Sequence, residues 1–195
     1  MPQITKENVL EILGKKILPG KSATINLNMA KLYTTTSVEV PVIIERSKNP
    51  GPVVLITAGI HGDELNGVEI VRQLISKEIN KPKCGTTICI PVVNVFGFLN
   101  MAREFPDGRA LHRMFPGTKN GSLASRFAFQ FVQEILPIAD FCLDFHTGGA
   151  SRFNVAQIRV KKGDKHSIEL ANIFKAPFTI VSTTITKSYR ETCSK

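Results

Sequence analysis

The 195-residue sequence contains no tryptophan and two tyrosines. Tryptophan and tyrosine provide surfaces on which single-stranded bases stack, so the scarcity of these two residue types argues against a nucleic-acid-binding domain. The net charge of +9 would suit either a nucleic acid or an anionic small molecule. Because the basic residues are dispersed rather than gathered in a run, we expect no nucleic-acid partner. A small anionic substrate and a solvated basic surface both remain compatible with the charge.

Long apolar segments are also missing. No apolar run approaches the length of a membrane span, so we expect no membrane partner. The first residues, MPQITKENVLEILGKK, lack the apolar stretch and the small-residue cleavage site of a secretory signal. These absences predict a cytoplasmic protein, and an oligomer is compatible with them.

The four cysteines form no CxxC pair. They lie in or beside apolar segments, where a thiol behaves as a small hydrophobic side chain. We therefore expect neither a disulfide framework nor a cysteine metal site.

Apolar runs typical of buried strands alternate with segments of helical periodicity. The expected strands are two within residues 22–45 and the runs VVLITAG, TTICIPVVNVFGFL, FCLDFHT, NVAQIRV and FTIVSTT. The expected helices are Lys6–Lys15 and residues 63–79, 123–136 and 166–175. This alternation predicts a single α/β domain over residues 1–195, with a mixed, largely parallel sheet and helices on both faces. The last residues, SYRETCSK, read as a helix start with no strand after it, so we expect the N-terminal part of a longer chain.

Metal-ligating side chains follow two of these apolar runs. His61 and Glu64 lie in PVVLITAGIHGDELNG, where a strand passes into a helix, and His146 follows FCLDF. Functional sites of open α/β sheets lie at the carboxyl ends of strands. Two histidines and a carboxylate form a catalytic zinc ligand set, which also suits ferrous iron. Each residue alone is more commonly a hydrogen-bonded or surface side chain, but the repeated strand–histidine context favours a metal site.

Three motifs together resemble a known enzyme family. GIHGDE, RALHRMFPG and DFHTG are similar to motifs of the succinylglutamate desuccinylase/aspartoacylase family of the zinc carboxypeptidase superfamily, and the likeness runs from about Pro41 onward. It implies a zinc carboxypeptidase-like fold with His61, Glu64 and His146 as Zn²⁺ ligands. It also implies a zinc-dependent hydrolase that cleaves the amide bond of an N-acyl amino acid, or of a similar substrate bearing a carboxylate, such as a peptide C-terminus.

Asp144 precedes His146 by two residues and lies on the same side of an extended strand. A carboxylate that accepts the second ring N–H of a ligand histidine fixes its tautomer and orientation. The resemblance supports this catalytic supporting role. The alternative is a buried aspartate that caps a nearby helix.

The family motif DLNRxFPG corresponds to the stretch ALHRMFPG here. Arg113 matches the motif, which implies that it binds the substrate carboxylate and stabilises the oxyanion. Ala110 replaces the aspartate and His112 replaces the asparagine, so His112 is the expected second donor to the substrate. Arg103 resembles an upstream substrate-binding arginine. A solvated loop charge is the alternative for Arg103.

The family's general base is a glutamate on a later strand, and no residue of this sequence matches it. We therefore expect a chain that binds Zn²⁺ but turns over slowly. The alternative is a non-catalytic metal-binding or interaction module derived from the same fold, which the changes at Ala110 and His112 favour.

Overall fold

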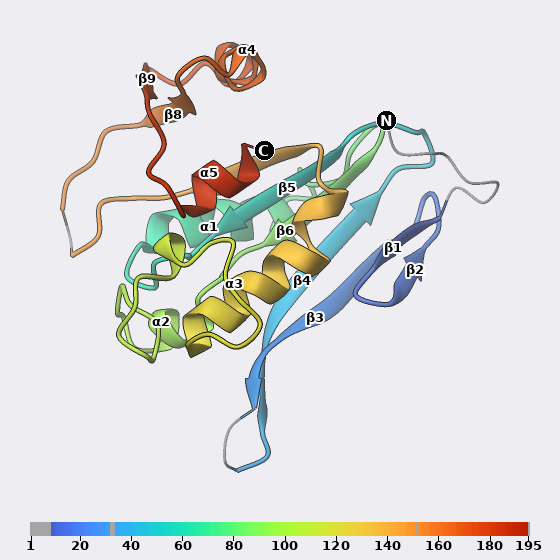
Figure 1. Ribbon diagram of the computed structural model, residues 1–195. Helices are drawn as coiled ribbons and strands as arrows, with labels where there is room; N and C mark the ends of the chain where they lie inside the picture. Colours follow the sequence, from blue (N-terminus) through green and yellow to red (C-terminus); the bar gives the residue numbers. More distant parts are fainter. Residues whose placement is uncertain (1–8, 32–33, 151, 195) are drawn as a thin grey trace.

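A computed structural model describes residues 9–31, 34–150 and 152–194 of the chain. Its centre is a five-stranded sheet in the order β3-β4-β6-β5-β7 (Figure 1). Strand β4 pairs antiparallel with β3 and β6, whereas β5 pairs parallel with β6 and β7. The strands are β3 (Ser22–Lys31), β4 (Ser37–Arg46), β5 (Val53–Ala58), β6 (Thr86–Ile90) and β7 (Phe141–Phe145). The predicted mixed α/β sheet is confirmed.

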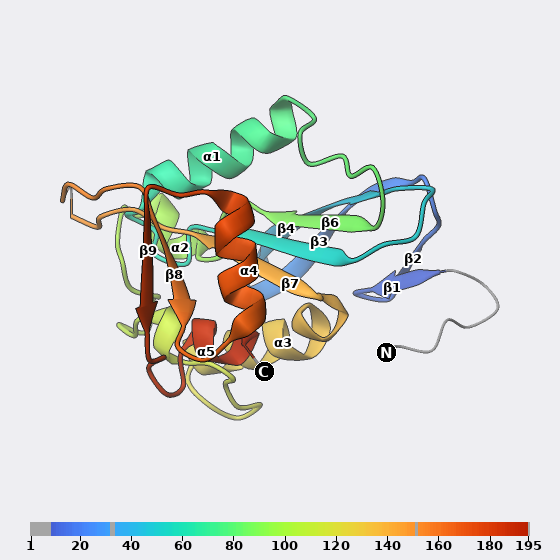
Figure 2. The ribbon, with the colours of Figure 1, turned by 90° about the horizontal axis from the view of Figure 1, so that it is seen from above.

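Helices cover both faces of this sheet, as the sequence predicts. Helix α1 (Leu65–Ser76) lies on one face, and α3 (Leu123–Glu134) and α5 (Tyr189–Cys193) lie on the other (Figure 2). Under α1 a small apolar cluster joins Val71 to Ile56, Ala58 and Cys89. The larger core lies on the α3 side and includes Phe127 and Phe131 at 1% and 0% exposure. Burial of the apolar faces of α1 and α3 holds the sheet between these helices.

The opening helix expected at Lys6–Lys15 is wrong for its described part. That part forms a hairpin of β1 (Leu10–Ile12) and β2 (Lys15–Ile17), and residues 6–8 lie outside the described part. Leu13 and Gly14 connect the strands with φ values of 49° and 71°. Two central residues with positive φ match the hairpin turn that follows strand twist. The glycine that suggests a helix end is therefore a hairpin residue.

The segment after the main sheet forms a small unit of its own. Strand β8 (Gln157–Lys161) pairs parallel with β9 (Phe178–Ser182), and α4 (Lys165–Phe174) connects them. The predicted strands exist, but they pair with each other rather than with the five-stranded sheet. The remaining elements are α2 (Val95–Leu99) and the 3-10 turns η1 (Leu111–Arg113) and η2 (Leu136–Ile138).

In the described part of the chain, no helix has both the length and the apolar character needed to cross a membrane.

Candidate metal centre

The turn between β5 and α1 presents His61 and Glu64. Gly59 has a φ of 62°, a conformation that favours glycine and lets the chain leave the strand sharply. A side chain at Gly62 would meet the backbone carbon of Gly97 at 1.9 Å, so only glycine fits against α2. Glu64 precedes the first residue of α1 but makes no capping hydrogen bond to it. Its carboxylate is instead directed into the site.

Three side chains converge at the carboxyl ends of β5 and β7. One ligand atom each from His61, Glu64 and His146 lies within 4.8 Å of the other two. The two carboxylate oxygens of Glu64 face the two histidines: Oε1 is 2.7 Å from His61 Nδ1, and Oε2 is 2.9 Å from His146 Nδ1. His61 and Glu64 are buried, at 4% exposure each, whereas the His146 side chain is 39% exposed. Parallel pairing of β5 with β7 brings these distant motifs together.

Asp144 contacts the outer nitrogen of His146. Its Oδ2 lies 2.5 Å from His146 Nε2, and its Oδ1 accepts a hydrogen bond from the Thr57 hydroxyl at 2.7 Å. Thr57 is the β5 partner of Asp144 in the sheet register, and its hydroxyl is also 3.3 Å from the Tyr189 hydroxyl of α5. The carboxylate is therefore held by Thr57, whose hydroxyl also contacts Tyr189, while it orients the imidazole.

Further donors converge on Glu64. Arg103 Nη1 donates to Oε1 at 2.8 Å, and the backbone N–H of Thr147 donates to Oε2 at 3.1 Å. Burial opposes ionisation of this carboxylate, but hydrogen bonds from His146 and His61 hold its pKa well below the usual range. Burial likewise opposes protonation of His146, yet Asp144 and Glu64 raise its pKa to about 10.

His112 and Arg113, the expected substrate-binding residues, lie beside this cluster. His112 Nδ1 is 2.7 Å from His61 Nε2, and the two rings meet edge to face with centroids 4.5 Å apart. Arg113 is exposed, and its Nε donates to His112 Nε2 at 3.3 Å. Burial, together with repulsion from His61 and from the guanidinium groups of Arg103 and Arg113, lowers the pKa of His112 to about 4. The ring is therefore neutral at neutral pH.

The donor set fits a divalent metal ion. Both ligand histidines direct Nδ1 toward Glu64, and their Nε2 atoms have other partners. Two imidazole nitrogens and one carboxylate are the protein ligands of a catalytic zinc site. Asp144, on the outer nitrogen of His146, favours the tautomer that such a site needs at this histidine, with Nδ1 free of a proton. The Nδ1 atoms of the two histidines and the Glu64 carboxylate lie close enough to one another to bind one ion.

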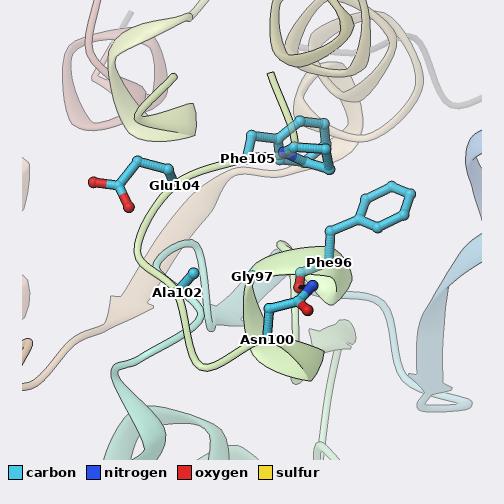
Figure 3. Close-up of a pocket in the computed structure, with 7 residues that line it drawn as sticks. Phe96, Gly97, Asn100, Ala102, Glu104 and Phe105 are labelled. Atoms are coloured by element: carbon cyan, nitrogen blue, oxygen red, sulfur yellow. Dashed lines mark hydrogen bonds between the residues drawn. The ribbon is translucent and has the colours of Figure 1, made fainter. Parts of the chain in front are cut away.

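A cavity of about 230 Å³ lies against α2 (Figure 3). It is lined by Phe96, Gly97, Asn100, Ala102, Glu104, Phe105 and Pro106. Ala102 and Glu104 flank Arg103, whose guanidinium contacts Glu64 of the candidate metal centre. Glu104 is the one ionisable residue in the lining, and in Figure 3 its carboxylate is directed away from Phe96 and Phe105. The three candidate metal ligands are not among the residues that line this cavity.

Residues 50–194 match the family described as the succinylglutamate desuccinylase/aspartoacylase catalytic domain. The chain belongs to this family. A curated relative, the N-alpha-acetyl-L-2,4-diaminobutyric acid deacetylase of Halomonas elongata, is 30% identical over 151 residues, which cover 74% of the chain and 44% of the relative. The chain thus spans less than half the length of that deacetylase.

Solved structures of the same family share the fold. An aspartoacylase family protein from Mesorhizobium loti has 30% identity and a TM-score of 0.73, covering 84% of this chain and 53% of its own. A succinylglutamate desuccinylase/aspartoacylase from Rhodobacter sphaeroides has 27% identity and a TM-score of 0.74, covering 82% and 52%. The zinc carboxypeptidase-like architecture implied by the motifs is confirmed.

The sequence patterns did not indicate two residues that lie next to this candidate metal centre. The Thr57 hydroxyl donates to Asp144, and the Tyr189 hydroxyl contacts that of Thr57; both residues are buried, at 1% and 3% exposure. A hydroxyl inside the apolar run VVLITA is the signal that could have identified Thr57. Tyr189 had no such signal, because its position depends on how α5 packs.

Proposed function

We propose that the chain carries the zinc site and part of the substrate pocket of an amide hydrolase that removes an acyl group from an amino acid. The supporting observation is the convergence of His61 Nδ1, His146 Nδ1 and the Glu64 carboxylate within 4.8 Å. We assign these three side chains as the metal ligands. When bound there, Zn²⁺ would supply Lewis-acid polarisation of a carbonyl group and activation of a water molecule.

The surrounding side chains have distinct roles in this proposal. Asp144 accepts the Nε2 proton of His146 and so keeps Nδ1 free for the metal. Arg103 neutralises the Glu64 carboxylate from the side. The expected substrate contact of Arg103 therefore competes with this ion pair. Arg113 is exposed and contacts His112 through Nε, so its terminal guanidinium nitrogens are the expected donors to a carboxylate and to the oxyanion.

An N-acyl amino acid is the substrate class that these groups favour. In this proposal its carboxylate pairs with Arg113, which is connected to the cluster through His112. The name of the Halomonas elongata relative describes an N-acetyl amino acid as its substrate. Ala110 and His112 replace two residues of the family's substrate motif, so the proposal is made for N-acyl amino acids as a class.

We also propose that the general base is not among the described carboxylates of the cluster. The two that contact it in the described part of the chain are both engaged. Glu64 accepts from Arg103, Thr147 and the two histidines. Asp144 is held by Thr57 and His146. A general base must reach the proton that it removes. The expected behaviour is metal-dependent substrate binding with slow turnover.

The test measures binding and turnover separately. N-acetyl and N-succinyl amino acids are titrated calorimetrically into the chain with and without Zn²⁺, and release of free amine is followed in parallel. We expect Zn²⁺-dependent binding that is lost in His146→Ala and weakened at least tenfold in Arg113→Ala, with Arg126→Ala as the matched surface control. Turnover at an ordinary enzymatic rate would contradict the base assignment, and no binding in the Zn²⁺-loaded chain would contradict the deacylase site.

A non-catalytic metal-binding module is the second candidate. Its support is the engagement of both carboxylates together with the contact of His112 on His61, at the position of the family's substrate-binding asparagine. This candidate predicts Zn²⁺ binding with no affinity for any N-acyl amino acid in the same titration.

A further inference from the structure

His112 lies between His61, a proposed metal ligand, and Arg113, the expected substrate-binding arginine. Its Nδ1 contacts His61 Nε2 at 2.7 Å, and its Nε2 accepts from Arg113 Nε at 3.3 Å. A continuous series of contacts thus runs from an exposed guanidinium to a buried carboxylate: Arg113, His112, His61, Glu64.

The contacts fix where each ring proton lies. A neutral imidazole has one N–H group, whereas the guanidinium is always a donor. With Arg113 donating to His112 Nε2, the His112 proton is on Nδ1 and is donated to His61 Nε2. The His61 proton is then on its Nδ1, where Glu64 Oε1 accepts it at 2.7 Å. Every donor in this direction meets an acceptor.

A metal ion at His61 requires the opposite direction. The Nδ1 atom that binds the metal must have its lone pair free, so the His61 proton must be on Nε2. That proton is donated to His112 Nδ1, and the single proton of His112 is then on Nε2. The proton between the rings passes from His112 Nδ1 to His61 Nε2, the His61 Nδ1 proton is released to water, and His112 Nε2 takes up a proton from water. Each ring therefore keeps one proton. At His112 Nε2 the N–H now faces the N–H of Arg113, and two donors cannot share a hydrogen bond.

We propose that metal binding at His61 reverses this series and converts His112 from an acceptor into a donor. His112 Nε2–H and the released Arg113 guanidinium then form a two-donor site for one carboxylate. His112 is half-buried and Arg113 is exposed, so this pair lies at the accessible edge of the cluster. The inference rests on the proposed metal site and predicts an order of binding, in which the metal binds first and prepares the carboxylate site. Because coupling is reciprocal, a bound carboxylate also strengthens metal binding.

The tautomers of the histidines test this inference directly. The chain has four histidines, and ¹⁵N spectra of their side chains distinguish Nδ1–H from Nε2–H. His166 is the internal control because its side chain is 87% exposed. His112→Asn removes one set of signals and so assigns His112. On addition of Zn²⁺ we expect both His61 and His112 to exchange to the Nε2–H form while His166 is unchanged.

The outcomes separate this inference from the proposed function. A Zn²⁺-dependent change at His61 and His146 with His112 still protonated on Nδ1 would overturn the inference and leave the metal site standing. No change at His61 on addition of Zn²⁺ would overturn both.

A second measurement uses acetate as the carboxylate probe. Zn²⁺ affinity is measured by chelator competition with and without acetate in the wild type and in His112→Asn. An asparagine amide offers a donor and an acceptor together, so it needs no reversal. We expect acetate to raise Zn²⁺ affinity several-fold more in the wild type than in the variant. An equal enhancement in both would overturn the coupling.

Discussion

At the scale of residues, the proposed metal site depends on Asp144, which holds the imidazole of His146. Asp144 receives the Thr57 hydroxyl on one oxygen and His146 Nε2 on the other. Because the strands hold the carboxylate in place, the imidazole has one favoured tautomer and one orientation. A partner of this kind outside the ligand set commonly contributes 10-fold to 100-fold to metal affinity, by order of magnitude.

Replacing Asp144 by asparagine should therefore weaken Zn²⁺ binding by about 10-fold to 100-fold without unfolding the chain. The amide keeps the shape of the side chain but removes the charge that holds the ring proton on Nε2. Chelator competition gives the affinity, and Glu169→Gln, at a 72% exposed carboxylate, is the matched control. Wild-type affinity in Asp144→Asn would refute the supporting role.

At the scale of elements, the site depends on close approach of the β5–α1 turn to α2. A methyl group at Gly62 would lie 1.9 Å from the Gly97 backbone carbon and 2.2 Å from the Phe98 nitrogen. Neither atom belongs to a flexible side chain, so relief requires movement of the backbone that presents His61 and Glu64.

We expect Gly62→Ala to lower the free energy of unfolding by about 3 kcal/mol or more and to reduce Zn²⁺ affinity as well. Gly163→Ala is the control, because a Cβ there meets nothing within 4 Å and strain arises from its φ of 84° alone. That strain costs about 1–2 kcal/mol and should leave the metal site unaffected. Chemical denaturation gives the free energy of unfolding of both variants. Equal losses of stability would contradict the argument that Gly62 is closely packed.

The elements also show what a sequence can predict about such a site. Apolar runs identified β5 and β7, and their parallel pairing explains why His61 and His146 meet. The position of Arg103 was harder to predict from the sequence, because it depends on the path of a long irregular loop. Its guanidinium lies on Glu64 rather than being directed freely toward a substrate. The local pattern also predicted a helix where the first hairpin lies. Gly14 forms a hairpin turn there, and burial of Ile12 and Ile17 in the core, which the local pattern does not reveal, stabilises the hairpin.

For the whole molecule, a metal ion would join two separate parts of the chain. His61 and Glu64 lie before α1, whereas His146 follows β7. A ligand that binds only the folded chain adds about 2.7 kcal/mol of stability at 100 times its dissociation constant. We expect Zn²⁺ at that concentration to raise the melting temperature, a chelator to reverse the shift, and His61→Ala to abolish it. A shift of the same size in His61→Ala would mean that Zn²⁺ binds elsewhere.

The most direct test of the account is the metal content of the purified chain, measured for the wild type, His146→Ala and the control His166→Ala. His166 is the one histidine outside the cluster and its side chain is 87% exposed. We predict about one Zn²⁺ per chain in the wild type and in His166→Ala, and essentially none in His146→Ala. Folded wild-type protein that binds no metal, or His146→Ala that retains it, would contradict the claim that the two motifs meet at one ion.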